Sequence, residues 1–493
     1  MPRPLVLVHG YSADAKAFVQ VRAALLAAAK TQKIELIDIN VCNYISLNNE
    51  ITIKDIAEGF DRALGLRKGL SNGEEFDAIV HSTGMLVVRA WLANYGGPLS
   101  TNTRLKRLKH LVGLAPATWG SPQAHKGRTW LGALVKGNRQ LGPDFLNAGD
   151  RVLEGLELGG EFTWDLSTED LLGEQPYYGV GGNTPYVTVF IGNSEYTGLS
   201  AVANSPGCDG TVRWAGCGLN TRKITVDLTR TGIDGQRVQM SKWADDRLDI
   251  PIIPVDGKSH ATILSDPDPG MIDLVLKFLN VSSASEHATW LTAAKAFGEK
   301  GMAKMLEPPS PSFLEGLEED VKEGIRKLLS KAAKPAAAAM KGWQQFAVVM
   351  RDEWGDGIPD YLMNILRWDD GKKDWVKFEN MYMDVHAYGP DQSYRCFYMY
   401  LPAELSQQGT RLCLSINAST GTDLMAYRAY TTAKTSFQLC EQSDPVHLEI
   451  TNLGPTGQET LFYPFTTTMI EIMINREPVP FDKNTRVLNF EEI

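Results

Sequence analysis

The chain of 493 residues carries a net charge of −10, and apolar residues make up 43% of it. This length predicts two to four domains, and the apolar share is that of a packed globular protein. The negative charge, without a long basic run, argues against nucleic-acid binding. We find no apolar segment of membrane-spanning length, and no signal peptide, because the first residues already read as a core strand. We therefore expect a cytoplasmic protein, with signal-independent export or trimming of a longer chain as alternatives.

The chain opens with a continuous apolar run, residues 4–8. A run without alternation predicts a strand buried on both faces, as in a parallel sheet. The turn after it, His9-Gly10-Tyr11, places backbone N–H groups at the carboxyl end of this strand. Such donors suit a reaction that develops negative charge on an oxygen. An ordinary strand-to-loop turn with a hydrogen-bonded histidine would have the same pattern.

The most informative motif lies within residues 76–90, where an apolar run leads through His81-Ser82-Thr83-Gly84 into a helix-like pattern. This layout is typical of a nucleophile elbow, a strand-to-helix turn that holds a serine hydroxyl above a sheet. The serine backbone is strained there, so the residues two before and two after it are usually small. Gly84 fits this rule and Val80 does not. For this segment alone, a buried strand that meets a helix is an equal alternative.

Two later segments supply an acid and a base, each after an apolar run. Asp209 lies in a turn after the predicted strand 185–192, and His260 lies in a loop after the apolar run 250–255. The chain order Ser82, Asp209, His260 is the order found in α/β-hydrolases and differs from those of chymotrypsin and subtilisin. An Asp-Gly turn and a loop histidine are both common, so the order of the three residues is the specific signal.

Residues 1 to about 280 resemble an α/β-hydrolase of the bacterial lipase and esterase type. The matching motifs are V-x-V-H-G at the start, V-H-S-T-G around Ser82, A-P-A-T-W-G-S-P at 115–122, C-D-G-T-V at 208–212 and S-H-A-T-I at 259–263. The resemblance implies a mostly parallel central sheet with a cap or lid insertion. Two residues depart from the family pattern, Val80 and Met85. We expect Val80 to change how the strand packs on the helix without removing a catalytic atom.

The same resemblance implies a role for each candidate site residue. Ser82 would be the nucleophile, His260 its general base and Asp209 the acid that orients this base, with the backbone N–H groups of Tyr11 and Thr83 as oxyanion donors. The implied activity is hydrolysis of carboxylic esters through an acyl-enzyme, without a cofactor or metal. We expect short- to medium-chain esters, because the chain lacks a secretion signal and is modestly hydrophobic. The alternatives are a phospholipase or acyltransferase on this fold, or a non-catalytic binding protein.

The two histidines beside these motifs have structural interpretations. We expect His9 to be a hydrogen-bonded scaffold. We expect His81 to point away from the partner of the Ser82 hydroxyl and to support the turn or the oxyanion loop. No Cys/His spacing predicts zinc, and no glycine-rich loop with a lysine predicts a nucleotide site.

Further carboxylates lie close to the candidate base. Asp256 is an alternative to Asp209 as the orienting acid. Together with Asp266 and Asp268 it could also coordinate calcium, which binds carboxylate and carbonyl oxygens. A turn followed by a helix start at 267–269 is the favoured interpretation of the last two.

Six cysteines in so long a chain do not predict a disulfide scaffold. Cys208 and Cys217 bracket Asp209 within a short loop, and a disulfide between them would clamp it. Free thiols are the alternative and fit a reducing compartment better.

A long insertion, about residues 121–184, separates two predicted core elements. We expect a cap or lid over the candidate serine, with helical pieces whose apolar faces cover or line an acyl pocket. Packing of the same side chains on the body of the protein is the alternative. The large apolar residues in and next to this insertion are Trp119, Trp130, Leu131, Leu134, Leu141, Phe145, Leu146, Leu153, Leu156 and Trp164.

The remaining chain predicts a different kind of domain. We expect a hydrolase domain at 1–283, a helical linker rich in Ala, Lys and Glu at 284–342, and a β-sandwich-like accessory domain at 343–493. Its aromatic side chains could form a surface for lipid, glycan or polymer, although filling of the core is favoured for most of them. Short alternating segments with regular turns predict strands at 360–368, 394–401, 411–416, 424–430, 447–450 and 467–474.

Overall fold

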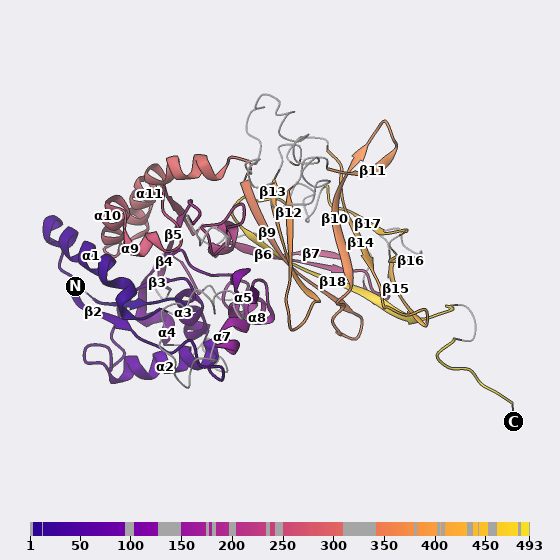
Figure 1. Cartoon of the computed structure of the whole chain (residues 1–493), viewed down its shortest axis with the longest axis horizontal. Helices are drawn as coiled ribbons and strands as arrows, with labels where there is room; N and C mark the ends of the chain where they lie inside the picture. Colours follow the sequence, from indigo (N-terminus) through magenta and orange to yellow (C-terminus); the bar gives the residue numbers. More distant parts are fainter. Residues whose placement is uncertain are drawn as a thin grey trace. The chain divides into compact units, whose positions relative to one another are not determined.

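The computed structural model of the chain consists of two compact units, here called the α/β unit and the β unit (Figure 1). The α/β unit comprises Met1–Thr221, Trp243–Glu307 and Phe465–Thr467, and the β unit comprises Arg222–Lys242, Pro308–Pro464 and Thr468–Ile493. The structure describes residues 3–11, 13–93, 103–126, 149–173, 177–179, 184–196, 204–232, 237–241, 250–308, 342–378, 382–401, 405, 410–430, 437–441, 443–451, 461–481 and 485–492. Along these ranges no helix combines the length and the apolar character needed to cross a bilayer.

The α/β unit is built on a parallel sheet with the strand order β2-β1-β3-β4-β5-β8. Strands β1, β3 and β5 are buried along their whole length, as expected when helices cover both faces of a sheet. The strands predicted at 4–8, 185–192 and 250–255 are confirmed. The strand bounds are β1 (Pro4–Val8), β2 (Ile37–Cys42), β3 (Phe76–His81), β4 (Leu108–Leu114), β5 (Tyr186–Gly192) and β8 (Ile252–Val255).

Helices pack on both faces of this sheet. Ile79 of β3 lies in one cluster with buried residues of α1 and α10. Phe76 of the same strand points to the opposite face, because side chains alternate along a strand. There its ring contacts Phe60 of α2 and Trp91 of α3, at centroid distances of 6.4 and 5.7 Å. The helix bounds are η1 (Ala15–Phe18), α1 (Val19–Gln32), α2 (Ile53–Leu66), α3 (Gly84–Ala93), α4 (Arg104–Arg107), α5 (Gln123–Lys126), α7 (Asp150–Leu156), α8 (Glu161–Asp170), η5 (Trp214–Cys217), α9 (Thr262–Ser265), α10 (Pro269–Phe278) and α11 (Ala284–Met305).

Helix α11 begins where the linker was expected, and it packs on β8 and α10 within the α/β unit. Close packing is possible because Gly298 and Gly301 face Pro254, where an added Cβ would come within 3.0 and 2.8 Å of the proline ring. Trp290 is also buried in this contact and donates to the Leu274 carbonyl at 2.9 Å. The rest of the expected linker, from residue 309 to 341, lies outside the described residues.

The β unit contains two mostly antiparallel sheets, ordered β11-β10-β14-β17 and β12-β13-β9-β18-β15-β16. Apolar residues from both sheets form one core, which confirms the predicted sandwich-like architecture. The six predicted strands are present as β10, β13, β14, β15, β17 and β18. The strand bounds are β9 (Gly342–Asp352), β10 (Tyr361–Asp369), β11 (Asp374–Lys377), β12 (Met383–Ala387), β13 (Tyr394–Leu401), β14 (Leu412–Ala418), β15 (Met425–Tyr430), β16 (Phe437–Leu439), β17 (Val446–Glu449) and β18 (Thr467–Pro478).

Two further strands of the larger sheet come from the middle of the chain. Strand β6 (Thr221–Asp227) pairs with β18 and with β7 (Val238–Met240). Ile224 and Val226 of β6 are buried in the core of the β unit. The chain therefore enters the β unit once between the candidate acid and the candidate base, a path that differs from the consecutive domains expected from the sequence.

Most aromatic residues of the β unit that were considered as a binding surface are at least half buried. Trp343 is 1% exposed and stacks on Tyr398 with 4.9 Å between ring centroids. Trp368 and Trp375 contact each other and the guanidinium of Arg411. Trp354, in contrast, is 79% exposed. Core filling thus accounts for Trp343 and Tyr398, as favoured from the sequence.

Candidate active site

Ser82 lies in a sharp turn between β3 and α3. Its φ is 51°, in the left-handed region that a side chain rarely adopts, so the backbone is strained as expected for an elbow. The turn is tight on both sides. A Cβ on Gly84 would lie 2.5 Å from the Val8 carbonyl oxygen, and the Ser82 carbonyl accepts from the Ala117 N–H at 3.1 Å. The predicted strand–turn–helix motif is confirmed.

The unusual Val80 is fully buried, and a glycine lies opposite it on the neighbouring strand. In the parallel pairing of β3 with β4, Val80 lies opposite Gly113, so both point to the same face of the sheet. An added Cβ on Gly113 would come within 2.8 Å of the Met85 Cε atom. Gly113, on the strand next to Val80, therefore leaves room for the Met85 side chain.

The loop after β1 lies directly against Ser82. A Cβ on Gly10 would lie 2.8 Å from the Ser82 Cβ and 3.3 Å from its Oγ atom. His9 fixes this loop, because its Nδ1 donates to the Gly10 carbonyl at 2.7 Å and its Nε2 accepts from the Tyr44 N–H at 3.3 Å. Burial lowers the pKa of His9, which favours the neutral ring, and the two hydrogen bonds select this tautomer. The predicted scaffold role of His9 is confirmed. Its bond to the Gly10 carbonyl holds the peptide group that also carries the Tyr11 N–H.

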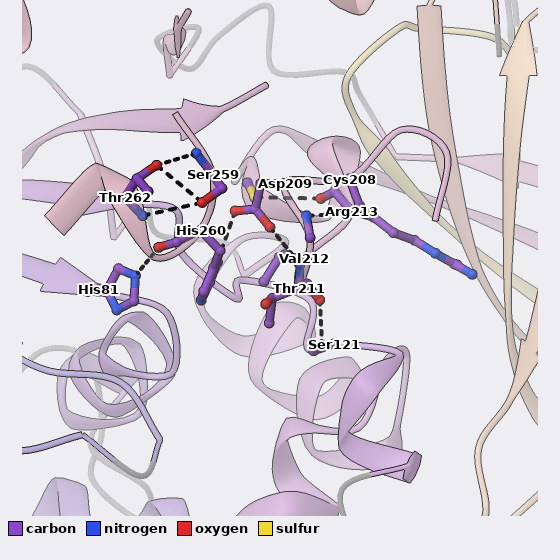
Figure 2. Close-up of polar contacts among 12 residues, drawn as sticks. His81, Ser121, Cys208, Asp209, Thr211, Val212, Arg213, Ser259, His260 and Thr262 are labelled. Carbon is purple, nitrogen blue, oxygen red and sulfur yellow. Dashed lines mark hydrogen bonds and ion pairs between the residues drawn. The ribbon is translucent and has the colours of Figure 1, made fainter. Parts of the chain in front are cut away.

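His260 and Asp209 form a hydrogen-bonded pair (Figure 2). The His260 Nδ1 donates to Asp209 Oδ2 at 2.9 Å, and the His260 backbone N–H donates to the Asp209 carbonyl, also at 2.9 Å. The second carboxylate oxygen, Oδ1, accepts from the N–H groups of Thr211 and Val212 at 3.0 and 2.8 Å. Asp209 is fully buried, so these bonds replace the water that its charge would otherwise require.

The loop that carries His260 is closed by its neighbours. Thr262 Oγ1 accepts from the Ser259 N–H at 2.7 Å, and Ser259 Oγ accepts from the Thr262 N–H at 3.3 Å. On the far side of this loop, His81 Nε2 lies 3.0 Å from the His260 carbonyl, and the two rings are 4.7 Å apart. The expectation that His81 points away from the partner of the Ser82 hydroxyl is therefore wrong, because His81 packs on His260.

Asp256, the alternative orienting acid, has different partners. Its carboxylate forms ion pairs with Lys300 at 2.7 Å and Lys304 at 2.6 Å, both on α11. These hydrogen bonds hold the pKa of Asp256 well below its usual range. It also accepts from Asn193 at 3.2 Å. Of the two candidate acids, Asp209 is the one that is hydrogen-bonded to His260.

The two other carboxylates expected as possible calcium ligands each have their own partners. Asp266 pairs with Lys258 at 2.6 Å. Asp268 caps α10 by accepting from the N–H groups of Gly270 and Met271, which confirms the favoured helix start. Within the described ranges, no three His, Cys, Asp or Glu side chains are grouped so as to hold a metal ion.

Cys208 and Cys217 are both free and buried. The Cys208 thiol donates to the Ser205 carbonyl at 2.7 Å and lies 3.4 Å from the Gly210 N–H. Burial raises the pKa of Cys208 to about 12, so the thiol stays protonated. Hydrogen bonds from loop atoms, together with the Ser121 hydroxyl on the Thr211 carbonyl at 2.6 Å, hold the loop of Asp209 (Figure 2).

A buried ion pair that the sequence analysis missed joins α3 to the expected cap. Arg89 donates to both carboxylate oxygens of Asp170 at 2.8 Å, and both side chains are fully buried. Arg89 also donates to Ser167 Oγ at 3.0 Å and to the Thr118 carbonyl at 2.6 Å, while the Tyr178 hydroxyl donates to Asp170 at 2.6 Å. An arginine in an otherwise apolar helix was the available signal, because a buried charge requires a partner.

The described part of the insertion that was expected to form a cap is packed rather than open. Leu153, Leu156 and Trp164 on α7 and α8 are 3–6% exposed. Residues 127–148 lie outside the described residues, and with them the expected cap residues Trp130, Leu131, Leu134, Leu141, Phe145 and Leu146.

Tyr11 and Thr83 are the expected oxyanion donors. Tyr11 follows Gly10 in the loop after β1, and Thr83 lies between Ser82 and the start of α3, fully buried. Since β1, β3 and β8 are parallel, the segments that follow them meet at one edge of the sheet. The loops of Gly10, Ser82 and His260 are thus brought together at the carboxyl edge, and Asp209 joins them through His260.

No protein-family model matches the sequence, and no curated protein is significantly similar to it. Two structures of phospholipase PlaB from Legionella pneumophila, one of them in complex with thio-NAD, have a TM-score of 0.70 at 18% identity and cover 99% of this chain and 97% of their own. The lipase BlEst2 of Bacillus licheniformis in mature form reaches a TM-score of 0.34 at 13% identity, over 53% of this chain and 86% of its own. The likeness to the phospholipase extends over both units, so it confirms the predicted fold class along the whole chain.

Proposed function

We propose, from the α/β-hydrolase fold of this chain, that it is a serine hydrolase of carboxylic esters, lipid esters included. The observation that carries the proposal is the buried Asp209–His260 pair, at the sheet edge where the strained Ser82 turn also lies. A strained serine, a histidine and a buried carboxylate are the parts that acyl transfer requires, and α/β-hydrolases carry them in this chain order. A binding protein without catalysis would not need the strain at Ser82.

In this mechanism Ser82 Oγ attacks the ester carbonyl while the His260 Nε2 takes its proton. The proton on Nδ1 stays hydrogen-bonded to Asp209, whose negative charge stabilises the imidazolium. His260 then returns the proton to the leaving alcohol, which leaves an acyl group on Ser82. Water attacks this acyl-enzyme with His260 as the base again, and the acid is released.

The backbone N–H groups of Tyr11 and Thr83 are assigned the role of stabilising the negatively charged oxygen of the tetrahedral intermediate. Preorganised N–H donors stabilise such charge without reorganising during the reaction. The support for this assignment is the contact of Gly10 with Ser82 and the hydrogen bond by which His9 holds the Gly10 carbonyl.

Phospholipid esters are the second candidate substrate. The observation that favours them is the full-length likeness to a protein named as a phospholipase, which includes the β unit. Within the ester class, we keep a preference for short to medium acyl chains as part of the proposal. Acyl transfer to another alcohol would use the same residues.

Labelling with a fluorophosphonate probe tests the proposed chemistry, because Ser82 Oγ would displace fluoride from the probe's phosphorus. We expect the parent protein to be labelled at Ser82 and the Ser82→Ala variant to stay unlabelled. Absence of labelling in the folded parent protein would overturn the proposal. A series of p-nitrophenyl esters from acetate to palmitate, assayed beside phosphatidylcholine vesicles, then separates the substrates. Activity confined to long-chain or vesicle substrates would contradict the chain-length preference.

The Gly10→Ala variant is expected to lose activity by about 100-fold or more in kcat, because the new methyl group would overlap Ser82 and shift the oxyanion loop. Gly59→Ala is the matched control, since Gly59 lies within α2 with open space around its Cβ position. Steady-state kinetics with a soluble ester and thermal melting of both variants make the comparison. Equal kcat values for the two variants would contradict the assignment of the Tyr11 N–H as an oxyanion donor.

A further inference from the structure

We propose that His81, the residue before the nucleophile, is a positioning residue that holds the general base through its backbone. The inference rests on the proposed function, since it concerns the His260 loop of that mechanism. His81 itself exchanges no proton and forms no covalent bond in the proposed steps.

The contact is a hydrogen bond from a ring to a main-chain carbonyl (Figure 2). His81 Nε2 lies 3.0 Å from the His260 carbonyl oxygen. A carbonyl oxygen only accepts, so Nε2 must carry a proton and the bond selects this tautomer. The two rings also pack at 4.7 Å with an interplanar angle of 49°. Both side chains are less than a tenth exposed, so water does not compete freely for this bond.

His81 contacts a second part of the site on its other side. An added Cβ on Gly10 would lie 3.3 Å from His81 Nδ1, so this ring nitrogen lies against the loop after β1. His81 therefore lies between the loop next to Ser82 and the loop that carries His260. Because it directly precedes Ser82 in the chain, it couples the position of the base to the position of the nucleophile.

The hydrogen bond from His81 completes the fixation of His260. The His260 backbone N–H donates to the Asp209 carbonyl, and its side-chain Nδ1 donates to the Asp209 carboxylate. Both of these bonds lie on the Asp209 side. The His81 bond fixes the peptide on the opposite side, so the imidazole is held from both directions, as Figure 2 shows.

The charge state of His81 suits this role. Burial, and next the neighbouring His260, lower the pKa of His81 to about 3. The titratable groups that face it are His260 and His9, whose charges lower this pKa, while the hydrogen bond to the His260 carbonyl raises it by less. His81 thus remains neutral while His260 gains and loses its proton, and the Nε2–H bond persists through the cycle.

The test compares two substitutions of His81 on the full-length protein. His81→Gln keeps an N–H donor at a similar distance from the backbone, and His81→Leu has a similar volume but no donor. We expect His81→Leu to lower kcat by about 10- to 100-fold with KM changed less than about twofold, as for a small misplacement of a reacting group. We expect His81→Gln to recover most of this loss. The exposed His447 in the β unit provides the matched control, His447→Leu, with unchanged kinetics.

A second readout separates positioning from general stability. The rate of fluorophosphonate labelling should fall together with kcat in His81→Leu. The acid limb of the pH profile of kcat/KM should fit one ionisation, that of His260, in the parent protein and in His81→Gln. A shared loss in both His81 variants, or an unchanged kcat in His81→Leu, would overturn the inference. If His81→Leu does not fold, His81→Asn, whose amide is too short to reach the carbonyl, replaces it. The parent protein remains labelled in every such case, whereas failure of the proposed function would abolish labelling of the parent itself.

Discussion

We expect the Asp209→Asn variant to hydrolyse esters with a kcat lower by about 10³- to 10⁴-fold while it stays folded. Oδ1 of Asp209 accepts two loop N–H groups, from Thr211 and Val212. The amide oxygen of asparagine must take this position, which places the NH₂ group 2.9 Å from His260 Nδ1 where Oδ2 lies now. An NH₂ group donates, so the His260 proton moves to Nε2. With that proton in place, His260 cannot accept the proton of Ser82.

Asp256→Asn is the matched control, because Asp256 is the same residue type close to the same histidine in the sequence. Its lysine partners on α11 lie outside the proposed mechanism, so kcat should remain within about threefold of the parent value. Steady-state kinetics with a soluble ester and thermal melting are the measurements. Equal kcat losses in both variants, or a loss only in Asp256→Asn, would show that Asp209 is not the orienting acid.

The second large effect concerns stability. Arg89→Met is expected to lower the free energy of unfolding by about 3–5 kcal/mol, because it leaves the Asp170 carboxylate buried without its countercharge. For a unit of this size, this corresponds to a melting temperature lower by roughly 6–15 °C. Loss of the two other hydrogen bonds from the guanidinium, to the Ser167 hydroxyl and the Thr118 carbonyl, adds to the effect.

An exposed ion pair serves as the control. Arg62 pairs with Glu58 one turn away on α2, and both side chains are more than half exposed. Arg62→Met should therefore change stability by less than about 1 kcal/mol. The double variant Arg89→Met/Asp170→Leu should regain part of the loss, since it no longer buries an unpaired charge. A melting temperature for Arg89→Met equal to that of Arg62→Met would show that the buried pair does not stabilise the packing of α8 on α3.

The features that could be predicted from the sequence depend on residues that are close together in the chain. Unbroken apolar runs gave the positions of β1, β5 and β8, because a strand buried on both faces leaves no polar alternation. The Asp209–His260 contact was expected from the resemblance to α/β-hydrolases, which the motifs around the two residues and their order in the chain supported. Asp268, whose side chain caps α10 at the predicted helix start, is likewise a local signal.

The features that the sequence did not predict depend on partners far away in the chain. Nothing near β6 indicates that it pairs with β18, and Arg89 does not identify Asp170 as its partner. The orientation of His81 depends on where the His260 loop arrives, 179 positions later. Helix α11 is a different case. Its buried residues recur at helical spacing, but an Ala- and Lys-rich composition concealed this stripe. These residues are His287, Trp290, Ala294, Gly298, Gly301 and Met305.

The pairing of β6 with β18 has a consequence for the order in which the protein can be made. The Leu228 N–H at the end of β6 donates to the Met473 carbonyl of β18, and the nearby Arg230 N–H donates to Asn475 across 245 positions. At usual rates of translation, the ribosome needs about 10–50 s to cover that distance. During this time the β6–β7 hairpin is complete but its partner strand has not been synthesised, and a lone two-stranded hairpin is only marginally stable in water. The nascent chain therefore exposes an unpaired strand edge between its proposed acid and base until β18 has emerged.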